Sequence, residues 1–509
     1  MEVRRRAVPN NLIACRVLDD SRDAFSQEPL ASRLVRRERI QTDKESVSLV
    51  RLSQLRQSSP MDTILRQYGY SVSDATWFYL SLLLIVAVFF RFNRIFSLRN
   101  LDLVLLLSIA PGVLLVQDGY QYGYGWLFVV TGCLLVRLFG DSFWKRRPLL
   151  EQNLNSAGMA FLTVSVFVLL ISKALTEPPP QGTVETVRRA DELRKRQDTT
   201  HEQPVTEEVP AGPTARVLAA PVLAASEIAV SGGSPNQEDR WAIEQIAARS
   251  TAVLAHLAVV SGLWFLGKRL FDDANSGLAM ATLYLLLPCT AIDVGKVNHV
   301  LPAALIVWAF VAYRSPLIAG GLMGLACGTL MFPLFLLPLW AVFYGKQGAG
   351  RFVLAVGVVA AVLAASLLLT SVDSHSFTKQ ILGSIDWSSL TLSSDAAGFW
   401  SAYSGVYRIP VIVAFFVMLL ILTFLPREKN LEHLLGHSTA IVVGTQLWYP
   451  QQGGAYVLWY LPLLLAVVFR PKLTSKTPPV IAPAPAEEQR LEMPTRMLAG
   501  VSWFRRRGS

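Results

Sequence analysis

The sequence predicts an all-α fold, a polytopic bundle of about 13 transmembrane helices with a long polar outward loop and disordered termini. Hydrophobic residues make up 52% of the 509 residues, and charged residues make up only 17%. A soluble domain carries about 25% charged residues. The charges also cluster in 1–75, 176–250 and 471–509, which leaves long apolar stretches between them. This composition excludes a cytosolic enzyme, a secreted disulfide scaffold and a nucleic-acid-binding domain.

The two ends of the chain are polar. Residues 1–60 are Arg-rich, lack an apolar run and are predicted to be disordered, as is the Pro-rich, basic stretch 471–509. One hypothesis is that Met61 is the native start, so that 1–60 is an upstream misreading or a regulatory tail. Mass spectrometry of the native protein tests this hypothesis, because any peptide from before Met61 excludes it.

Apolar runs of about 20 residues mark the spans. Four runs form an N-terminal membrane module, 61–175, at about 76–92, 101–117, 124–140 and 157–174. A second membrane module, 251–470, has nine, at about 251–267, 276–291, 299–313, 315–332, 334–345, 352–371, 410–425, 438–450 and 455–470. The pair around Pro333 and Pro338 could form two helices, or one span followed by a re-entrant piece.

Basic residues in the short loops indicate the orientation of the spans. With thirteen spans, all the Lys/Arg-bearing short loops fall on one side, which we predict to be the cytoplasm; they contain Arg91, Arg94, Arg99, Lys145, Arg146, Arg147, Lys268, Arg269, Arg314, Lys346, Arg351, Arg427, Lys429, Arg470, Lys472 and Lys476. The net charge of +10 is therefore interpreted as a topology signal for a multi-pass protein of the cytoplasmic (inner) membrane, surrounded by membrane lipids. The Arg-rich stretch 1–60 conflicts with the outward N-terminus that this topology requires.

Two outward connections are long. Residues 176–250 contain a run of three prolines, 178–180, and a charged helical stretch near 184–197. They are predicted to form a mobile extracytoplasmic linker between the two membrane modules. Their end, from Glu238 onward, is amphipathic and could form an interfacial helix. The other long connection, 372–409, mixes aromatic side chains with aspartates.

A short outward loop between the sixth and seventh spans is rich in polar groups. It places Asp293, Lys296, Asn298 and His299 within seven residues, between two apolar helices. An ionisable group near membrane depth costs about 2.5–3.5 kcal/mol at a helix centre, so such groups tend to be functional. The alternative is a solvated loop whose polar residues cap the two helices.

The region from about 276 to 345 resembles the GT-C superfamily of membrane glycosyltransferases. The similarity lies in the loop Gly295-Lys296-Val297-Asn298, a helix, the turn at Arg314-Ser315-Pro316, the small-residue helix 319–326 and the Leu-rich stretch after Pro333. Within this superfamily, the region looks most like the bacterial mannosyltransferase-type branch, whose members use a polyprenyl-phosphate-linked sugar. Two positions depart from that pattern: Lys296 stands where Gln is usual, and the residues before Pro333 are apolar where the family has Lys.

The resemblance implies a lipid-linked sugar donor, a glycan or lipid acceptor and no nucleic acid. An acceptor hydroxyl would attack the sugar while a carboxylate takes its proton, and Asp293 is the best-placed general base. The leaving lipid phosphate would be held by cations or backbone amides, for which Lys296, His299 and Arg408 are the candidates, and Asn298 is a further candidate for substrate binding. The alternative for Arg408 is an interfacial anchor. No cofactor is expected, and a metal is not obligatory when the leaving group is a lipid monophosphate.

Two aromatic outward turns are candidate sugar platforms. One contains Asp118, Tyr120 and Tyr122, and the other contains Trp448, Tyr449 and Gln451. Both place aromatic faces beside amide or carboxylate groups, so that they could line a cleft above the bilayer. Because Trp and Tyr also form ordinary interfacial belts, this second interpretation stays open.

Other patterns are weaker. His433 and His437 are four residues apart on one helix, but no third metal ligand is evident. The four cysteines are far apart and are interpreted as buried hydrophobic residues. No P-loop, GxSxG or HExxH motif occurs. The alternatives to a glycosyltransferase are a transporter or flippase, and a non-catalytic membrane scaffold that binds a lipid-linked glycan.

Overall fold

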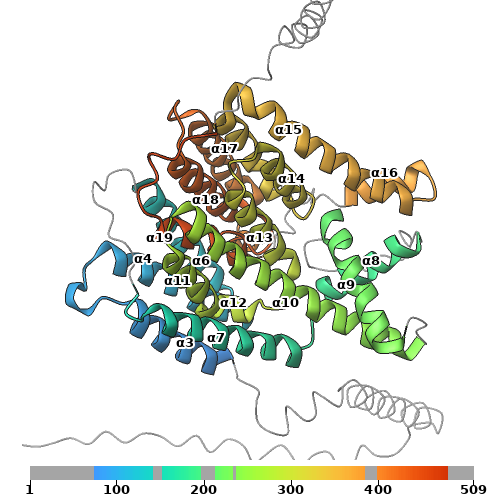
Figure 1. The fold of residues 1–509 in the computed structure, drawn as a ribbon, viewed down its shortest axis with the longest axis horizontal. Coiled ribbons are helices and arrows are strands. Elements are labelled where there is room, and N and C mark those ends of the chain that lie inside the picture. Colours follow the sequence, from blue (N-terminus) through green and yellow to red (C-terminus); the bar gives the residue numbers. More distant parts are fainter. Residues whose placement is uncertain (1–73, 141–151, 197–211, 233–236, 384–397, 480–509) are drawn as a thin grey trace, which may run out of the picture. The chain divides into compact units, whose positions relative to one another are not determined.

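The computed structural model describes residues 74–140, 152–196, 212–232, 237–383 and 398–479. Every regular element in these ranges is a helix, which confirms the predicted all-α polytopic fold (Figure 1). The predicted tail 1–60 and the part of 471–509 beyond residue 479 lie outside the described residues, as do Lys145, Arg146 and Arg147.

The N-terminal spans form five helices, because one predicted span is broken. They are α3 (Asp74–Phe89), α4 (Leu98–Leu107), α5 (Ile109–Gln117), α6 (Tyr122–Phe139) and α7 (Ser156–Thr176). Ser97 caps α4 by accepting a hydrogen bond from the Asn100 N–H. The break between α4 and α5 falls at Ser108. Pro111 explains it, since proline has no N–H to donate to the carbonyl of Leu107.

Helices occupy the segment where a mobile linker was expected. They are α8 (Gln181–Lys195), α9 (Pro213–Ser231) and the first part of α10 (Gln237–Leu270), with residues 197–211 and 233–236 outside the description. Val187, Leu223 and Ile243, one from each helix, are buried in a common small core. We call α8, α9 and residues 237–250 of α10 the outer lobe. The stretch predicted as a linker thus contains helices that share a small core, while Leu218 and Ile228 of α9 are exposed.

The remaining helices follow the predicted spans closely. They are α11 (Ala274–Leu286), α12 (Pro288–Ile292), α13 (Val297–Val311), α14 (Pro316–Cys327), α15 (Leu337–Thr370), α16 (Ser374–Gly383), α17 (Arg408–Phe424), α18 (Leu431–Trp448) and α19 (Leu461–Phe469). The doubtful stretch around Pro333 is a 3₁₀ turn, Phe332–Leu336, that leads into α15. Two predicted runs then join in α15 across a kink at Gly345, whose φ is 59°.

Seven helices of the described residues are long and apolar enough to cross a membrane, and four shorter apolar helices accompany them. One of the seven is 213–230, inside the outer lobe, where the sequence indicated no span. This finding confirms a helical membrane protein, and the count of about 13 spans stays a prediction.

The two predicted membrane modules share one core. The main cluster of buried apolar residues includes members of every helix from α3 to α7 and of α10 to α19 except α16. Contacts cross between the two predicted membrane modules. The hydroxyls of Thr163 and Thr282 lie 2.6 Å apart, and the rings of Phe89 and Phe469 pack edge to face with centroids 6.1 Å apart. The domain boundaries themselves stay a prediction.

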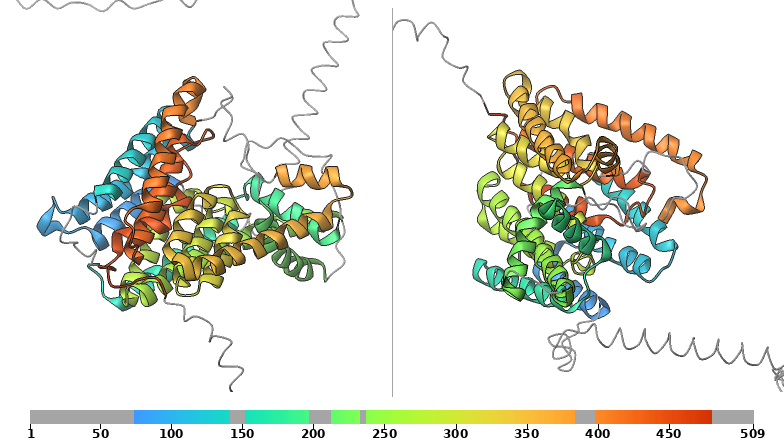
Figure 2. Two further views of the ribbon diagram at one scale, coloured as in Figure 1. Left: turned by 90° about the horizontal axis from the view of Figure 1, so that it is seen from above. Right: turned by 90° about the vertical axis from the view of Figure 1, so that its right-hand side faces the viewer.

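Several basic loops meet at one end of the bundle. Arg470 pairs with Glu432 at 3.1 Å, and the Lys476 ammonium lies 2.7 Å from an oxygen of Asp272 and donates to the carbonyl of Leu270 at 2.6 Å. These contacts join the α10–α11 turn to the start of α18 and to the chain after α19 (Figures 1 and 2). They support the prediction that these connections share a side.

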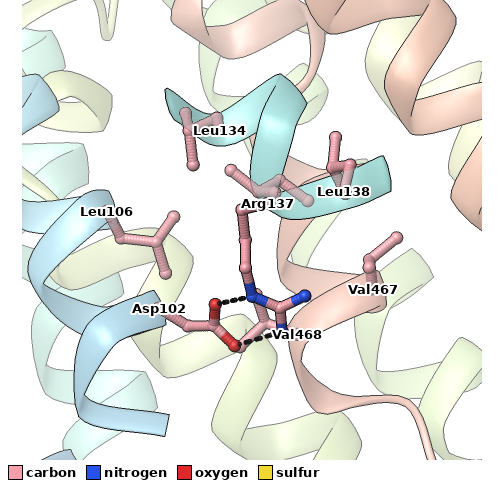
Figure 3. Close-up of a pocket in the computed structure, with 8 residues that line it drawn as sticks. Asp102, Leu106, Leu134, Arg137, Leu138, Val467 and Val468 are labelled. Carbon is pink, nitrogen blue, oxygen red and sulfur yellow. Dashed lines mark hydrogen bonds and ion pairs between the residues drawn. The ribbon is translucent and has the colours of Figure 1, made fainter. Parts of the chain in front are cut away.

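A buried ion pair links α4 to α6. The Arg137 guanidinium contacts both carboxylate oxygens of Asp102, at 2.6 and 2.9 Å, and the two side chains are only 13% and 8% exposed. Apolar side chains such as Leu106 and Leu134 surround the pair, with Val467 of α19 beside it (Figure 3). A bidentate geometry of this kind compensates both charges in an apolar setting.

Candidate functional site

The loop that holds most of the predicted site is a tight turn after a broken helix. Pro288 starts α12 after the break at Leu287, and α12 ends after one turn at Asp293. The Lys296 N–H then donates to the Asp293 carbonyl at 3.0 Å, which closes the turn before α13 begins at Val297. Asp293 and Lys296 are thereby placed on the same short turn.

Asp293 and Lys296 form an ion pair. The Lys296 ammonium lies 2.9 Å from the Asp293 carboxylate, and the two side chains are 38% and 10% exposed, respectively. The carboxylate is thus sheltered, and its negative charge is compensated from the more open side. The sequence predicts separate roles for these two residues, whereas the structure couples them. Such a pair can accept a proton and present a positive charge at neighbouring positions.

His299 lies in an aromatic stack on the first turn of α13. Its ring is stacked on Tyr456 with centroids 4.8 Å apart, and Tyr456 is stacked on Trp459 at 4.5 Å. The indole Nε1 of Trp459 donates to His299 Nδ1 at 2.7 Å. An imidazole that accepts at Nδ1 carries its proton on Nε2 and is neutral. His299 therefore offers an N–H donor and not the positive charge that we expected for binding phosphate.

Asn298 faces the outer lobe. It is 6% exposed, and its Oδ1 lies 3.3 Å from the hydroxyl of Thr186 on α8. The side chain that was predicted to bind substrate thus contacts a helix that sequence analysis assigned to a linker.

Arg408, Trp448 and Tyr449 are brought together, but inside the bundle. They are 1%, 0% and 4% exposed, and Arg408 Nε donates to the Trp448 carbonyl at 3.3 Å. The Trp448 ring packs against Phe415 and Phe335, with centroids 5.5 and 6.0 Å away. Trp448 is the last residue of α18, and its side chain points into the core there. The structure thus differs from the expected open sugar platform at Trp448, while Gln451, two residues after Tyr449, is partly exposed.

The other predicted aromatic turn is open. Asp118, Tyr120 and Tyr122 are exposed, and the two tyrosine rings lie 5.2 Å apart. The turn contacts the connection before α17, since the Ser401 hydroxyl lies 3.4 Å from the Gln121 side-chain oxygen. The helix α5, which ends at this turn, contacts α12, which ends at Asp293. The turn and the Asp293 loop are thus on the same end of the bundle.

A small pocket lies beside Lys296. Its volume is about 60 Å³, and its lining includes Pro178–Pro180 before α8, Arg249 of α10 and Gly295. Arg249 and the threonines of α8 were not predicted as site residues, because their segment is typical of a polar linker. The three prolines were the available signal, since such a run makes a rigid wall.

Among the described residues, no three His, Cys, Asp or Glu side chains lie close enough to hold a metal ion. The rings of His433 and His437 have other contacts: His433 Nδ1 accepts from the Asn430 N–H at 3.4 Å, and His437 Nδ1 lies 2.9 Å from the Leu422 carbonyl oxygen. These two rings therefore contact the backbone at the start of α18 and near the end of α17.

Residues 235–469 match the model of glycosyltransferase family 87. This is a family of GT-C-type membrane glycosyltransferases, so the resemblance found in the sequence is confirmed. We call residues 235–469 the family 87 module. No curated protein and no solved structure matches the chain.

The family 87 module runs from the start of α10 to the end of α19. It contains Asp293, Lys296, His299 and Arg408, but it excludes α3 to α9. Phe332, in the apolar stretch where the resembled branch has a lysine, is 2% exposed and stacks on Trp459 with centroids 4.6 Å apart. An aromatic contact with the His299 stack therefore occupies this position. The match covers somewhat less than half of the chain, and it places residues 235–469 beside a family of membrane glycosyltransferases.

Proposed function

We propose that this membrane glycosyltransferase moves a mannose-like sugar from a polyprenyl-phosphate donor to a glycan or lipid acceptor. The reaction takes place at the outer face of the cytoplasmic membrane, on the end of the bundle that carries the Asp293 turn. The observation that carries the proposal is the sheltered Asp293 carboxylate, paired with Lys296 at 2.9 Å, in a turn between two apolar helices of the family 87 module.

In the proposed reaction, the acceptor hydroxyl oxygen attacks the anomeric carbon of the sugar. The bond between that carbon and the phosphate oxygen breaks, and the polyprenyl phosphate leaves with the bonding electrons. The Asp293 carboxylate takes the proton of the attacking hydroxyl. The positive charge of Lys296 and the Nε2–H of His299 stabilise the negative charge that develops on the leaving phosphate. No metal is required for this balance of charge.

Other residues support binding in this proposal. Tyr120, Tyr122 and Asp118 form an exposed sugar-binding turn, and Gln451 offers an amide. Asn298 orients the start of α13, and Arg408 holds the end of α18 through the Trp448 carbonyl. Trp448 and Tyr449 then act as the packed support beneath the site.

The test compares two variants with the same chemical change. Asp293→Asn removes the proton acceptor and keeps the shape of the side chain. The control is Asp273→Asn at the start of α11, where the carboxylate caps the Asn275 N–H at 2.9 Å and asparagine caps equally well. Transfer from radiolabelled polyprenyl-phosphate mannose is measured in membranes that contain equal amounts of each protein.

We expect transfer by the native protein and the control, and a loss of at least 100-fold in Asp293→Asn. Full activity of Asp293→Asn would remove this residue from the mechanism. Absence of turnover by the native protein would favour the non-catalytic glycan binder, and uptake of substrate into proteoliposomes would favour the transporter.

A further inference from the structure

The start of α8 reaches the turn that carries the Asp293–Lys296 pair. The hydroxyl of Thr183 donates to the carbonyl of Gly295 at 2.7 Å and lies 3.4 Å from the N–H of Val297, from which it accepts. One hydroxyl can fill both roles, because it has one proton and two lone pairs. Gly295 and Val297 are the two neighbours of Lys296. Thr183 therefore holds the backbone on both sides of that residue.

The same contact is closely packed and closed to solvent. Thr183 is only 2% exposed. A Cβ atom added to Gly295 would lie 2.5 Å from the Pro180 ring, so the chain before α8 is as near to the turn as a glycine permits. One helical turn further on, Thr186 lies beside Asn298. The start of α8 thus lies alongside the turn over four of its residues, 183–186.

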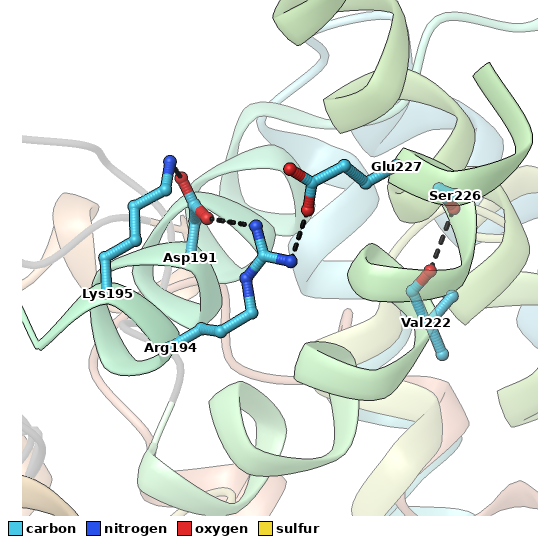
Figure 4. Close-up of polar contacts among 6 residues, drawn as sticks. All are labelled: Asp191, Arg194, Lys195, Val222, Ser226 and Glu227. Carbon is cyan, nitrogen blue, oxygen red and sulfur yellow. Dashed lines mark hydrogen bonds and ion pairs between the residues drawn. The ribbon is translucent and has the colours of Figure 1, made fainter. Parts of the chain in front are cut away.

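The outer lobe keeps α8 in place. Arg194, at the far end of α8, pairs with Asp191 on the same helix and with Glu227 of α9 (Figure 4). Arg188 reaches Glu244 of α10 at 3.6 Å. These ionic contacts join α8 to both of its partner helices.

The chain that enters α8 is held as well. The Arg249 guanidinium donates to the Glu177 carbonyl at 3.3 Å, and the Glu177 carboxylate pairs with Lys173 at 3.0 Å. The three prolines that follow have restricted backbones. Thr183 is therefore presented to the turn from a support that is fixed on both sides.

We propose that Thr183 is a positioning residue for the transfer reaction: by bridging Gly295 and Val297 it sets the place of the Asp293–Lys296 pair. The proposal rests on the function proposed above for that pair. It assigns part of the site to a helix outside the family 87 module, which begins at residue 235. A shift of about 1 Å in a reacting group can lower a rate about 100-fold, so a single hydroxyl at this place can matter.

The experiment uses two substitutions of Thr183 in the full-length protein. Thr183→Val keeps the shape and removes the hydroxyl, and Thr183→Ser keeps the hydroxyl. The matched control is Thr214→Val, since the Thr214 hydroxyl is buried in the same lobe and has no hydrogen-bond partner among the described residues. The readouts are kcat and KM with radiolabelled polyprenyl-phosphate mannose, and amide hydrogen exchange of a peptide that covers 293–299.

We expect Thr183→Val to lower kcat by about 10- to 100-fold with KM changed less than twofold, and to speed exchange in the turn at least tenfold. Thr183→Ser should restore kcat to within about threefold of the native value, and Thr214→Val should match the native protein. Should Thr183→Val fail to fold, Thr183→Cys, a weak hydrogen-bond donor of similar size, takes its place with the same expected results.

Two results would overturn the proposal: a native kcat in Thr183→Val, or equal losses in the Val and Ser variants. Failure of the proposed function is distinguishable from both. If the native protein transfers no sugar, the difference in exchange between the Val and Ser variants still shows whether the Thr183 hydroxyl holds the turn; equal exchange rates would reject it.

Discussion

Trp459 donates a hydrogen bond of 2.7 Å from its indole nitrogen to Nδ1 of His299. The contact joins the 3₁₀ turn before α19 to the first turn of α13, across 160 residues of sequence. It fixes both the orientation and the tautomer of the imidazole, because indole can only donate. The ring therefore presents its Nε2–H in one direction.

This contact predicts the effect of Trp459→Phe. The substitution keeps an aromatic ring in the stack but leaves Nδ1 of His299 without its donor, which costs about 1–3 kcal/mol of folding free energy. We also expect transfer activity to fall about tenfold, because the imidazole loses its fixed orientation. Thermal unfolding in detergent and initial rates measure the two effects.

Trp448→Phe is the matched control. The indole nitrogen of Trp448 is buried and has no hydrogen-bond partner among the described residues. Its removal should therefore cost only the packing of the smaller ring. Equal losses in the two variants would mean that the hydrogen bond to His299 contributes nothing measurable.

The ion pair of Asp102 and Arg137 predicts a large effect on stability. Asp102→Asn removes the charged carboxylate that contacts the Arg137 guanidinium at 2.6 and 2.9 Å in a largely apolar environment, so we expect a loss of about 3–5 kcal/mol. The comparison is Asp272→Asn, whose ion pair with Lys476 is open, with an aspartate side chain that is 75% exposed. That loss should stay below about 1 kcal/mol. Unfolding of both variants in the same detergent gives the difference; similar values would contradict the assignment.

The close approach of Gly295 to Pro180 predicts that a larger residue at position 295 destabilises the fold. In Gly295→Ala the new methyl group meets the Pro180 ring at 2.5 Å, and neither the turn nor the proline can yield easily. We expect a loss of about 1–3 kcal/mol and reduced transfer. A methyl group at Gly321, in the middle of α14, meets no atom within 4 Å. Gly321→Ala should therefore be neutral or slightly stabilising, and a loss as large as that of Gly295→Ala would argue against the close contact.

His433 predicts a dependence of stability on pH. Burial lowers the pKa of His433, and the nearby Lys429 and Arg470 lower it further, whereas Glu432 raises it. The unfolded state therefore binds a proton at a higher pH than the folded state. The stability that this residue contributes is present above the unfolded pKa of about 6.5 and is lost as the pH falls below it.

Thermal midpoints between pH 7.5 and pH 5 test this dependence. Protonation of His433 Nδ1 also removes the acceptor for the Asn430 N–H that caps α18. His433→Gln keeps a capping side chain and does not titrate, so its midpoint should fall less over the same range. Parallel curves for the native protein and the variant would place the dependence elsewhere.

Hydrophobic runs predicted most of the membrane helices, because the demand for about 20 apolar residues leaves a strong local signal. The same reasoning missed α8 and α9. Their burial depends on a few apolar side chains, such as Val187 and Leu223, that meet only when three helices are assembled. The sequence of α8 is polar and is locally indistinguishable from a linker. In contrast, α9 is apolar enough to cross a membrane, but its alanines and Pro221 are also typical of a linker.

The candidate site was predicted in part. Asp293 and Lys296 were found because ionisable residues are scarce between apolar helices. The burial of Trp448 could not be predicted, because a tryptophan at a helix end suits both a membrane interface and a core. Thr183 was missed for a different reason: a threonine contact across 112 residues leaves no trace in local composition.

The three prolines before α8 and the hydroxyl of Thr183 belong to a stretch that precedes the family 87 module. We therefore expect residues 235–469, expressed alone, to retain Asp293, the proposed proton acceptor, but to lose one wall of the pocket and the support of the turn. Conversely, exchange of α8 and its proline run between related enzymes would change the surroundings of Lys296 while leaving the acid–base chemistry intact.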